Sequence, residues 1–305
     1  MSAAATRSRG PVRHAAAPRT WRARLVRGRF TIARRAVQVL VLLAFIGTVR
    51  WGWTVAGRPV LSGNLSASSF GGTVPLADPF AVLQMLAAGQ PLAADVLIGA
   101  AVVAAFFGLL AGRSFCAWVC PMNLVTDAAA WTRRRLNVPG DLVHLLARSR
   151  YIVLALALLL SALTGLAAFD WISPVAALHR ELIYGAGLGL LGAAGIFLLD
   201  AFVLKHGWCG HLCPLGAFHA VIARPAWLRV AFDDATCTHC GDCVKVCPEP
   251  RVLNFAEAAE RGAVAPGECT QCGRCVAICP ENSLSFALRG HARRVESPSN
   301  PGEPR

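Results

Sequence analysis

The chain of 305 residues is 55% hydrophobic and only 15% charged, whereas a soluble globular domain has about 45 to 50% apolar and about 25% charged residues. This composition argues against an ordinary soluble protein, and the grouping of the apolar residues into a few long blocks indicates a membrane protein. The formal net charge of +13 would suit nucleic acid or an anionic membrane surface, so the positions of the arginines must decide between them.

The N-terminal segment is rich in Arg, Ala and Pro and has no sustained apolar periodicity. We predict that residues 1–35 form a basic, disordered tail. The apolar block at 36–49 is short for a membrane span and is followed by Arg50. We interpret it as a first transmembrane helix anchored by Trp51 and Trp53, and not as an export signal, because no small-residue cleavage site follows it.

Three clearer apolar blocks follow, at residues 96–112, 151–169 and 182–204. Each is close to the ~20 residues that cross the hydrocarbon core as a helix. Their Gly, Ala and Ser residues allow helix backbones to approach closely. We therefore predict an α-helical membrane bundle of four transmembrane helices within residues 36–222.

Arginine is distributed unevenly among the segments between these blocks. The N-terminal tail has ten Arg and segment 113–150 has six, whereas 57–92 and 170–181 have one each. Because short cytoplasmic segments collect positive charge, we predict a multi-pass protein of the bacterial inner membrane, with both termini and the C-terminal domain in the cytoplasm. Topology and anionic lipid then account for the basic charge, and we expect no nucleic-acid partner.

Two cysteine runs in the C-terminal part match the pattern C-x2-C-x2-C-x3-C-P of bacterial ferredoxins. In this pattern the first three cysteines of a run ligate one [4Fe-4S] cluster and the fourth ligates the other cluster. We therefore assign the first cluster to Cys237, Cys240, Cys243 and Cys279. The second cluster is assigned to Cys269, Cys272, Cys275 and Cys247.

Zinc and disulfides are the alternatives for these eight cysteines. Zinc favours two ligand pairs separated by a longer gap, and disulfides are rare in a reducing cytoplasm, so the spacing favours iron–sulfur clusters. The segments 228–232 and 283–288 are typical of short strands. We predict a small α+β two-cluster ferredoxin-type domain at 223–289 that needs its metal to fold, followed by a disordered tail at 290–305.

The remaining four cysteines form two C-x3-C-P motifs, each just after an apolar block. They are Cys116 and Cys120 before Pro121, and Cys209 and Cys213 before Pro214. The similar sequences around them suggest an internal repeat, and two thiols four residues apart on a helix are too distant for a disulfide. Two interpretations stay open: a third redox or metal site formed by all four thiols, or structural turns that dock the ferredoxin domain.

The order of spans and cysteine motifs resembles that of the NapH/MauN-type ferredoxin family over nearly all of residues 36–289. The resemblance rests on four spans together with the motifs CAWVCP, CGHLCP, CTHCGDCVKVCP and CTQCGRCVAICP, in this order. The resemblance implies a component of a quinol dehydrogenase complex rather than a stand-alone enzyme. Such a component takes electrons from menaquinol or ubiquinol and relays them through its clusters towards a periplasmic reductase such as nitrate reductase, by way of a periplasmic iron–sulfur or cytochrome partner. The alternative is an assembly or maturation factor that keeps metals or thiols reduced for another respiratory enzyme.

Asp200 interrupts the last apolar block four residues before that block ends. Quinol oxidation needs an apolar slot beside a proton acceptor, and an ionisable group at membrane depth is a candidate for such a role. We predict that Asp200 faces the interior of the bundle near the C-x3-C-P motifs and takes part in catalysis.

Overall fold

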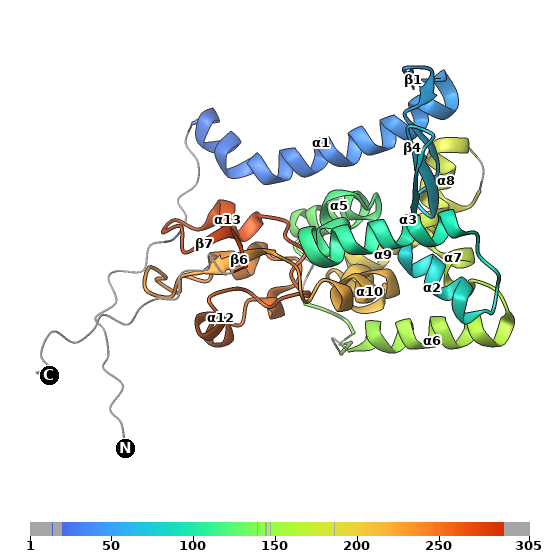
Figure 1. Cartoon of the computed structure of the whole chain (residues 1–305). Coiled ribbons are helices and arrows are strands. Elements are labelled where there is room, and N and C mark those ends of the chain that lie inside the picture. Colours follow the sequence, from blue (N-terminus) through green and yellow to red (C-terminus); the bar gives the residue numbers. More distant parts are fainter. Residues whose placement is uncertain are drawn as a thin grey trace, which may run out of the picture.

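The computed structural model describes residue 14 and residues 20–289, apart from positions 139, 144, 147 and 186. The predicted tail at 290–305 and most of residues 1–19 lie outside the described residues. The structure is mostly helical and elongated (Figure 1), with the cysteine-rich unit at residues 228–288 at one end and small sheets within residues 54–77 at the other.

The longest helix, α1 (Trp21–Trp51), runs along one side of the molecule (Figure 1). It begins where the Thr20 side chain accepts a hydrogen bond from the Ala23 amide, and it ends at Gly52, which has φ 63°. The prediction of disorder up to residue 35 is therefore wrong for residues 21–35. A long-range contact orders the end of this segment: Arg34 is buried, and its Nη2 lies 3.8 Å from Oδ2 of Asp127 in α5 (Met122–Arg135).

Among the residues that the structure describes, two helical segments are long and apolar enough to cross a membrane, namely α1 and the continuous stretch Ala94–Trp118. The second consists of α3 (Ala94–Ala105), a π-helical turn (Phe106–Ala111), a short 3-10 turn and α4 (Phe115–Trp118). Shorter apolar helices are α6 (Ser149–Thr164) and the segment Gly189–Val203. The bundle of four transmembrane helices thus stays a prediction, of which length and composition support two spans.

Glycine residues divide two of the predicted spans. Block 151–169 splits at Gly165, which has φ 69° and ends α6 before α7 (Ala168–Ile172). Block 182–204 splits at Gly185, which has φ 73° and ends α8 (Pro174–Tyr184) before α9 (Gly189–Leu198). Hydropathy did not reveal either break, because glycine adopts a left-handed conformation without making a segment less apolar.

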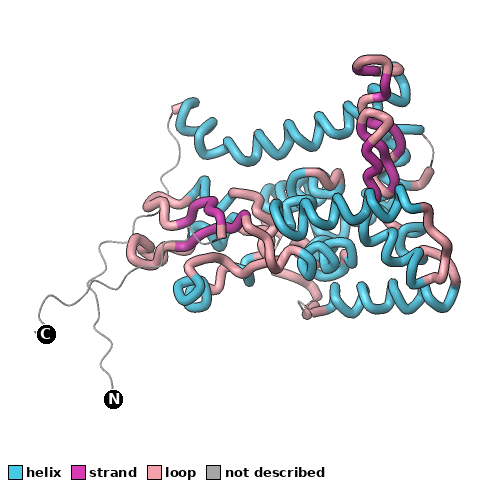
Figure 2. Tube along the Cα trace, in the orientation of Figure 1, coloured by secondary structure: helices cyan, strands magenta, loops and turns pink. Residues whose placement is uncertain are grey.

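The short strands lie at opposite ends of the molecule (Figure 2). At one end, β1 (Thr54–Val55) pairs with β2 (Arg58–Pro59). Next to them, β3 (Leu61–Gly63), β4 (Ala67–Phe70) and β5 (Val74–Ala77) form an antiparallel meander that leads into α2 (Pro79–Ala87). This meander closes the bundle at the end opposite the cysteine-rich unit.

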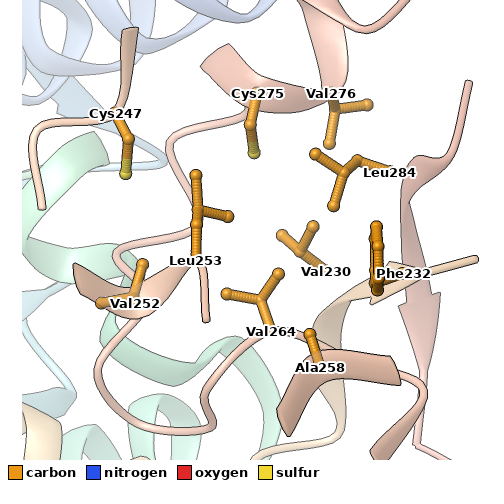
Figure 3. Close-up of a cluster of buried hydrophobic side chains, with 10 residues drawn as sticks. All are labelled: Val230, Phe232, Cys247, Val252, Leu253, Ala258, Val264, Cys275, Val276 and Leu284. Carbon is orange, nitrogen blue, oxygen red and sulfur yellow. The ribbon is translucent and has the colours of Figure 1, made fainter. Parts of the chain in front are cut away.

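In the cysteine-rich unit, β6 (Leu228–Phe232) pairs antiparallel with β7 (Leu284–Leu288), which confirms the two predicted strands. Between them come α11 (Asp242–Val246), α12 (Phe255–Arg261) and α13 (Arg274–Ile278). The apolar core of this unit is small (Figure 3), and Cys247 and Cys275 belong to it. Such a small core is marginal alone, so metal binding is expected to supply part of its stability.

The turn between α8 and α9 gives a first test. A Cβ atom on Gly189 would lie 2.5 Å from the backbone of Ala177, whereas one on Gly195 of the same helix would meet nothing within 4 Å. Gly189→Ala should therefore force α8 and α9 apart and cost ~1 to 3 kcal/mol. Gly195→Ala should be neutral or stabilise α9 by up to ~1 kcal/mol. Thermal unfolding of the detergent-solubilised proteins measures both, and equal midpoints would contradict this packing.

Candidate iron-sulfur site

The two ferredoxin-type runs fold into loops of the same backbone conformation. In the first, His239 and Gly241 have φ 53° and 77°, and in the second Gln271 and Gly273 have φ 53° and 74°. The amides of His239 and Gln271 each donate a hydrogen bond of 3.4 Å to the sulfur atom of the cysteine two residues earlier. These left-handed residues wrap each loop around its first three cysteines, as a cluster requires.

The structure groups the eight cysteines across the repeat. One small cavity is lined by Cys237, Cys240, Cys243 and Cys279. Cys247, the fourth cysteine of the first run, instead interacts electrostatically with Cys269 and Cys272, and Cys275 interacts with all three. The fourth cysteine of each run therefore lies with the first three of the other run, which is the arrangement of a two-cluster ferredoxin.

The spacing of the thiols tests which metal centre they suit. Within the described part of the chain, no three of the twelve cysteine sulfur atoms lie within 4.8 Å of one another. A single zinc ion would hold its thiolates about 3.8 Å apart, given Zn–S bonds of ~2.3 Å in a tetrahedron. The donor sets are therefore too wide for one ion, and their cysteine-only chemistry fits an iron–sulfur cluster.

Burial raises the pKa of several of these thiols, which keeps them protonated in the absence of metal. It raises the pKa of Cys243 to about 11 and that of Cys269 to about 12. A thiol must lose its proton to ligate iron. Cluster assembly therefore releases protons and offsets the cost of burying thiolates in this unit.

The two C-x3-C-P motifs come together at the junction between the helices and the cysteine-rich unit. Cys209 interacts electrostatically with Cys213, Cys120 and Cys116, and the aromatic rings of Phe115 and Trp208 pack against both motifs. Neither motif continues as a regular α-helix. Each ends in an irregular turn before its proline, and the sulfur of Cys213 accepts a hydrogen bond from the Gly216 amide at the start of α10 (Pro214–Ile222).

A buried charge network joins this junction to the ferredoxin-type loops. Arg113 and Arg150 belong to the helical part of the chain that precedes the cysteine-rich unit, and each has only 1% of its side chain exposed. Both point at Glu249, with N–O distances of 2.7 and 3.1 Å. Arg113 also donates hydrogen bonds to the carbonyl oxygens of Glu268, at 2.9 Å, and Cys209, at 3.4 Å. One guanidinium thus touches the segments that carry Cys209, Cys247 and Cys269.

The electrostatics of Glu249 follow from its neighbours. Burial alone would raise the pKa of this carboxyl, but Arg113, Arg150 and Arg251 outweigh it and hold the pKa below its usual value. Glu249 is therefore ionised in the folded protein. Sequence reasoning missed its role because it explained Arg113 and Arg150 by membrane topology alone; the one available signal was an acidic residue directly after the Cys-Pro pair.

Further contacts fix the same interface. The indole of Trp118 donates a hydrogen bond of 3.1 Å to the carbonyl oxygen of Gln271. Gly112 has φ 62°, and a Cβ there would lie 2.3 Å from the Gln271 side chain. Asp127 of α5 forms ion pairs with Arg35 of α1 and Arg274 of α13. The cysteine-rich unit is thus held by α1, α4 and α5 as well as by Glu249.

Asp200 lies buried beside the second C-x3-C-P motif. Its Oδ1 accepts a hydrogen bond of 3.0 Å from the Trp208 amide, and so it orients the turn that carries Cys209. An apolar cavity that adjoins the first motif is lined by other ionisable residues, Asp78 and His219. The structure thus gives Asp200 a positioning contact, and its part in catalysis stays a prediction.

Comparison with known proteins bears on the cysteine sites directly. Residues 229–280 match the model of the 4Fe-4S dicluster domain. Residues 92–139 and 186–233 match that of the 4Fe-4S binding domain, and these two segments contain the two C-x3-C-P motifs. The chain therefore carries iron–sulfur domains, and the internal repeat is confirmed.

Relatives match over most of the chain. The methylamine utilization ferredoxin-type protein MauN of Methylobacillus flagellatus is 42% identical over 233 residues, which are 76% of this chain and 80% of the relative. The ferredoxin-type protein NapH of Escherichia coli is 40% identical over 238 residues, 77% of this chain and 80% of the relative. The chain belongs to the NapH/MauN family of ferredoxin-type proteins.

Membership of the NapH/MauN family confirms the resemblance found in the sequence. NapH of Haemophilus influenzae is 41% identical over 227 residues, 74% of this chain and 77% of the relative. No solved structure gives a significant match. The family and the cysteine domains together identify an electron-transfer iron–sulfur protein.

The charge network predicts a large effect from a small change. Glu249→Gln keeps the shape of the side chain but leaves Arg113 buried without a carboxylate and Arg150 with Glu268 as its remaining carboxylate partner, which should cost ~3 to 5 kcal/mol. Glu257→Gln is the matched control, since Glu257 is half exposed and pairs with Arg261 one turn further along α12, an arrangement worth less than ~1 kcal/mol. Thermal unfolding should separate the two variants by several degrees, and similar midpoints would show that Glu249 does not hold the interface.

Proposed function

We propose that this protein is the membrane electron-transfer component of a quinol dehydrogenase complex, which takes electrons from quinol and relays them towards a periplasmic reductase such as nitrate reductase. The observation that carries the proposal is the buried contact of Arg113 with the segments of Cys209, Cys247 and Cys269. A relay needs its centres at fixed, short separations. A charge network with almost no solvent exposure supplies that rigidity.

The proposed relay uses two [4Fe-4S] clusters in the cysteine-rich unit. One is held by Cys237, Cys240, Cys243 and Cys279, which line one cavity. The other is held by Cys269, Cys272, Cys275 and Cys247, which interact with one another. Such clusters, when bound, accept and release single electrons. The backbone amides that point at Cys237 and Cys269 stabilise the negative charge of an added electron.

A third iron–sulfur centre at Cys116, Cys120, Cys209 and Cys213 completes the proposal. Three observations support it. The four thiols interact with one another, no three of them among the described residues lie close enough to bind a single metal ion, and the family model of a 4Fe-4S binding domain covers both motifs. This centre would lie between the membrane helices and the two ferredoxin-type clusters. It gives electrons a route between the bundle and the cysteine-rich unit.

The proposed topology has four membrane spans, with both termini and the clusters on the cytoplasmic side of the bacterial inner membrane. It is supported by the arginine distribution and by the two long apolar helices. A periplasmic iron–sulfur or cytochrome protein would then accept the electrons on the opposite side. The third centre, which adjoins the membrane helices, is the part of the relay nearest to that partner.

Quinol reactivity is the direct test of the function. Protein purified without oxygen and reconstituted in lipid nanodiscs is mixed with menaquinol or ubiquinol, and the clusters are followed by EPR. Reduced-cluster signals should appear with at least one quinol. Dithionite is the control for intact clusters. If dithionite reduces them but neither quinol does, even with the partner present, the protein is an assembly or maturation factor instead.

Metal analysis tests the number of centres. The wild-type protein should contain about twelve iron atoms per chain if three [4Fe-4S] clusters are present, and the double variant Cys209→Ser, Cys213→Ser should contain about eight. The EPR signals of the two ferredoxin-type clusters should persist in the variant. A wild-type content of about eight that the substitutions leave unchanged would show that the C-x3-C-P motifs are structural turns.

A further inference from the structure

An apolar cavity lies between the membrane helices and the β3–β5 meander, next to the first C-x3-C-P motif. Its volume is about 170 Å³. Its walls include Val41 of α1, Val103 of α3, and Phe107, Phe115 and Val119 further along the same stretch of chain. We propose that this cavity binds the aromatic ring of the quinol and that Asp78 accepts its protons. The proposal rests on the proposed function and locates its substrate.

The size and position of the cavity suit a ring with a long tail. Sites that enclose a whole drug-sized ligand have ~300 to 1,000 Å³, so 170 Å³ accommodates only the ring. Two walls come from α1 and α3, which belong to the two segments able to cross a membrane and extend along the same length of the molecule (Figure 1). An isoprenoid tail can therefore leave between these helices into lipid.

Two ionisable residues stand among the apolar walls. His219 has 1% of its surface exposed, its Nδ1 has no hydrogen-bond partner, and its ring stacks on Phe115 with centroids 4.9 Å apart. Burial lowers the pKa of His219 to about 3, so the ring is neutral. A buried, neutral imidazole nitrogen without a partner is suited to a hydrogen bond with a quinol oxygen.

Asp78 lies across the cavity at the start of α2, where its Oδ1 accepts a hydrogen bond of 2.9 Å from the Phe80 amide. Its low-dielectric surroundings, together with the nearby Asp170, raise the pKa of Asp78 to about 7. A carboxyl group with a pKa close to the working pH is an efficient proton acceptor.

A proton has a path away from Asp78. The same carboxylate lines a second cavity of about 20 Å³, together with Ser66 and Asp170. Ser66 donates a hydrogen bond of 3.0 Å to Asp170, and a space of this size holds one water. The polar groups thus continue from Asp78 to Asp170, which is partly exposed at the meander end of the molecule.

The electrons leave in another direction. Phe115 and Val119, which line the cavity, directly precede Cys116 and Cys120 in the chain. Oxidation of one quinol to quinone releases two electrons and two protons. Iron–sulfur centres held by the cysteines of the C-x3-C-P motifs and of the ferredoxin-type runs would accept these two electrons, one at each of two centres. The two protons pass in turn from the ring hydroxyls to Asp78 and on to Asp170.

The test combines a binding readout with a rate. Anaerobic protein in nanodiscs is photolabelled with an azido-ubiquinone, and the labelled peptide is found by mass spectrometry. We expect label in a segment that lines the cavity, namely α1, Ala94–Trp118 or the meander at 61–79, and loss of it in Val103→Trp, which fills the cavity. Asp78→Asn should keep the label, because Asn caps a helix as well as Asp does. It should slow cluster reduction by quinol about 100-fold or more, because an amide cannot take the proton.

Asp95→Asn is the matched control, since Asp95 is an exposed carboxylate in the first turn of α3 and should leave both readouts unchanged. Dithionite reduction shows whether each variant keeps its clusters. Label in a different segment, or wild-type rates in Asp78→Asn, would overturn this assignment while leaving the proposed function intact. Failure of every quinol to reduce the wild-type protein, with dithionite effective, would instead overturn the proposed function.

Discussion

A carboxylate shared by two buried guanidinium groups is the interaction on which the rest of this structure depends. Burying Arg113, Arg150 and Glu249 removes three charges from water, a cost that only close pairing can offset. Each partner belongs to a different part of the chain: the end of a candidate membrane helix, the start of α6, and the segment just after Cys247. The cysteine-rich unit therefore has one defined position on the helices.

That position gives the cysteine sites their relation to each other. The two ferredoxin-type loops exchange their fourth cysteines, so neither half can form a complete donor set alone. Arg113 links this unit to the second C-x3-C-P motif, because it donates hydrogen bonds to the carbonyl oxygens of Glu268 and Cys209. The repeated cysteine motifs of the sequence thus come together only because the cysteine-rich unit docks on the helices.

The cavity beside the first motif adds a division of roles. In the proposed quinol site, the carboxylates of Asp78 and Asp170 would take the protons, whereas Phe115 and Val119 of the same cavity directly precede two of the cysteines. A site that oxidises quinol has to separate electrons from protons, and the proposal assigns the protons to the carboxylates and the electrons to the C-x3-C-P motifs. Asp200, by contrast, stabilises the turn before Cys209 through a single backbone contact.

The sequence by itself determined the features that depend on local spacing. The strands at either end of the cysteine-rich unit follow from short apolar patterns, and the family follows from the order of the cysteine motifs, so β6, β7 and the family could all be predicted. The intervals within each cysteine run follow from the geometry of a cubane cluster, and the assignment of these cysteines to two clusters stays a prediction. Only the tertiary structure decided the start of α1 at Trp21, the break at Gly185, the Glu249 network and the cavity at Asp78 and His219. Arg113 and Glu249 are 136 residues apart, and no local pattern encodes which distant charges meet once the chain is packed.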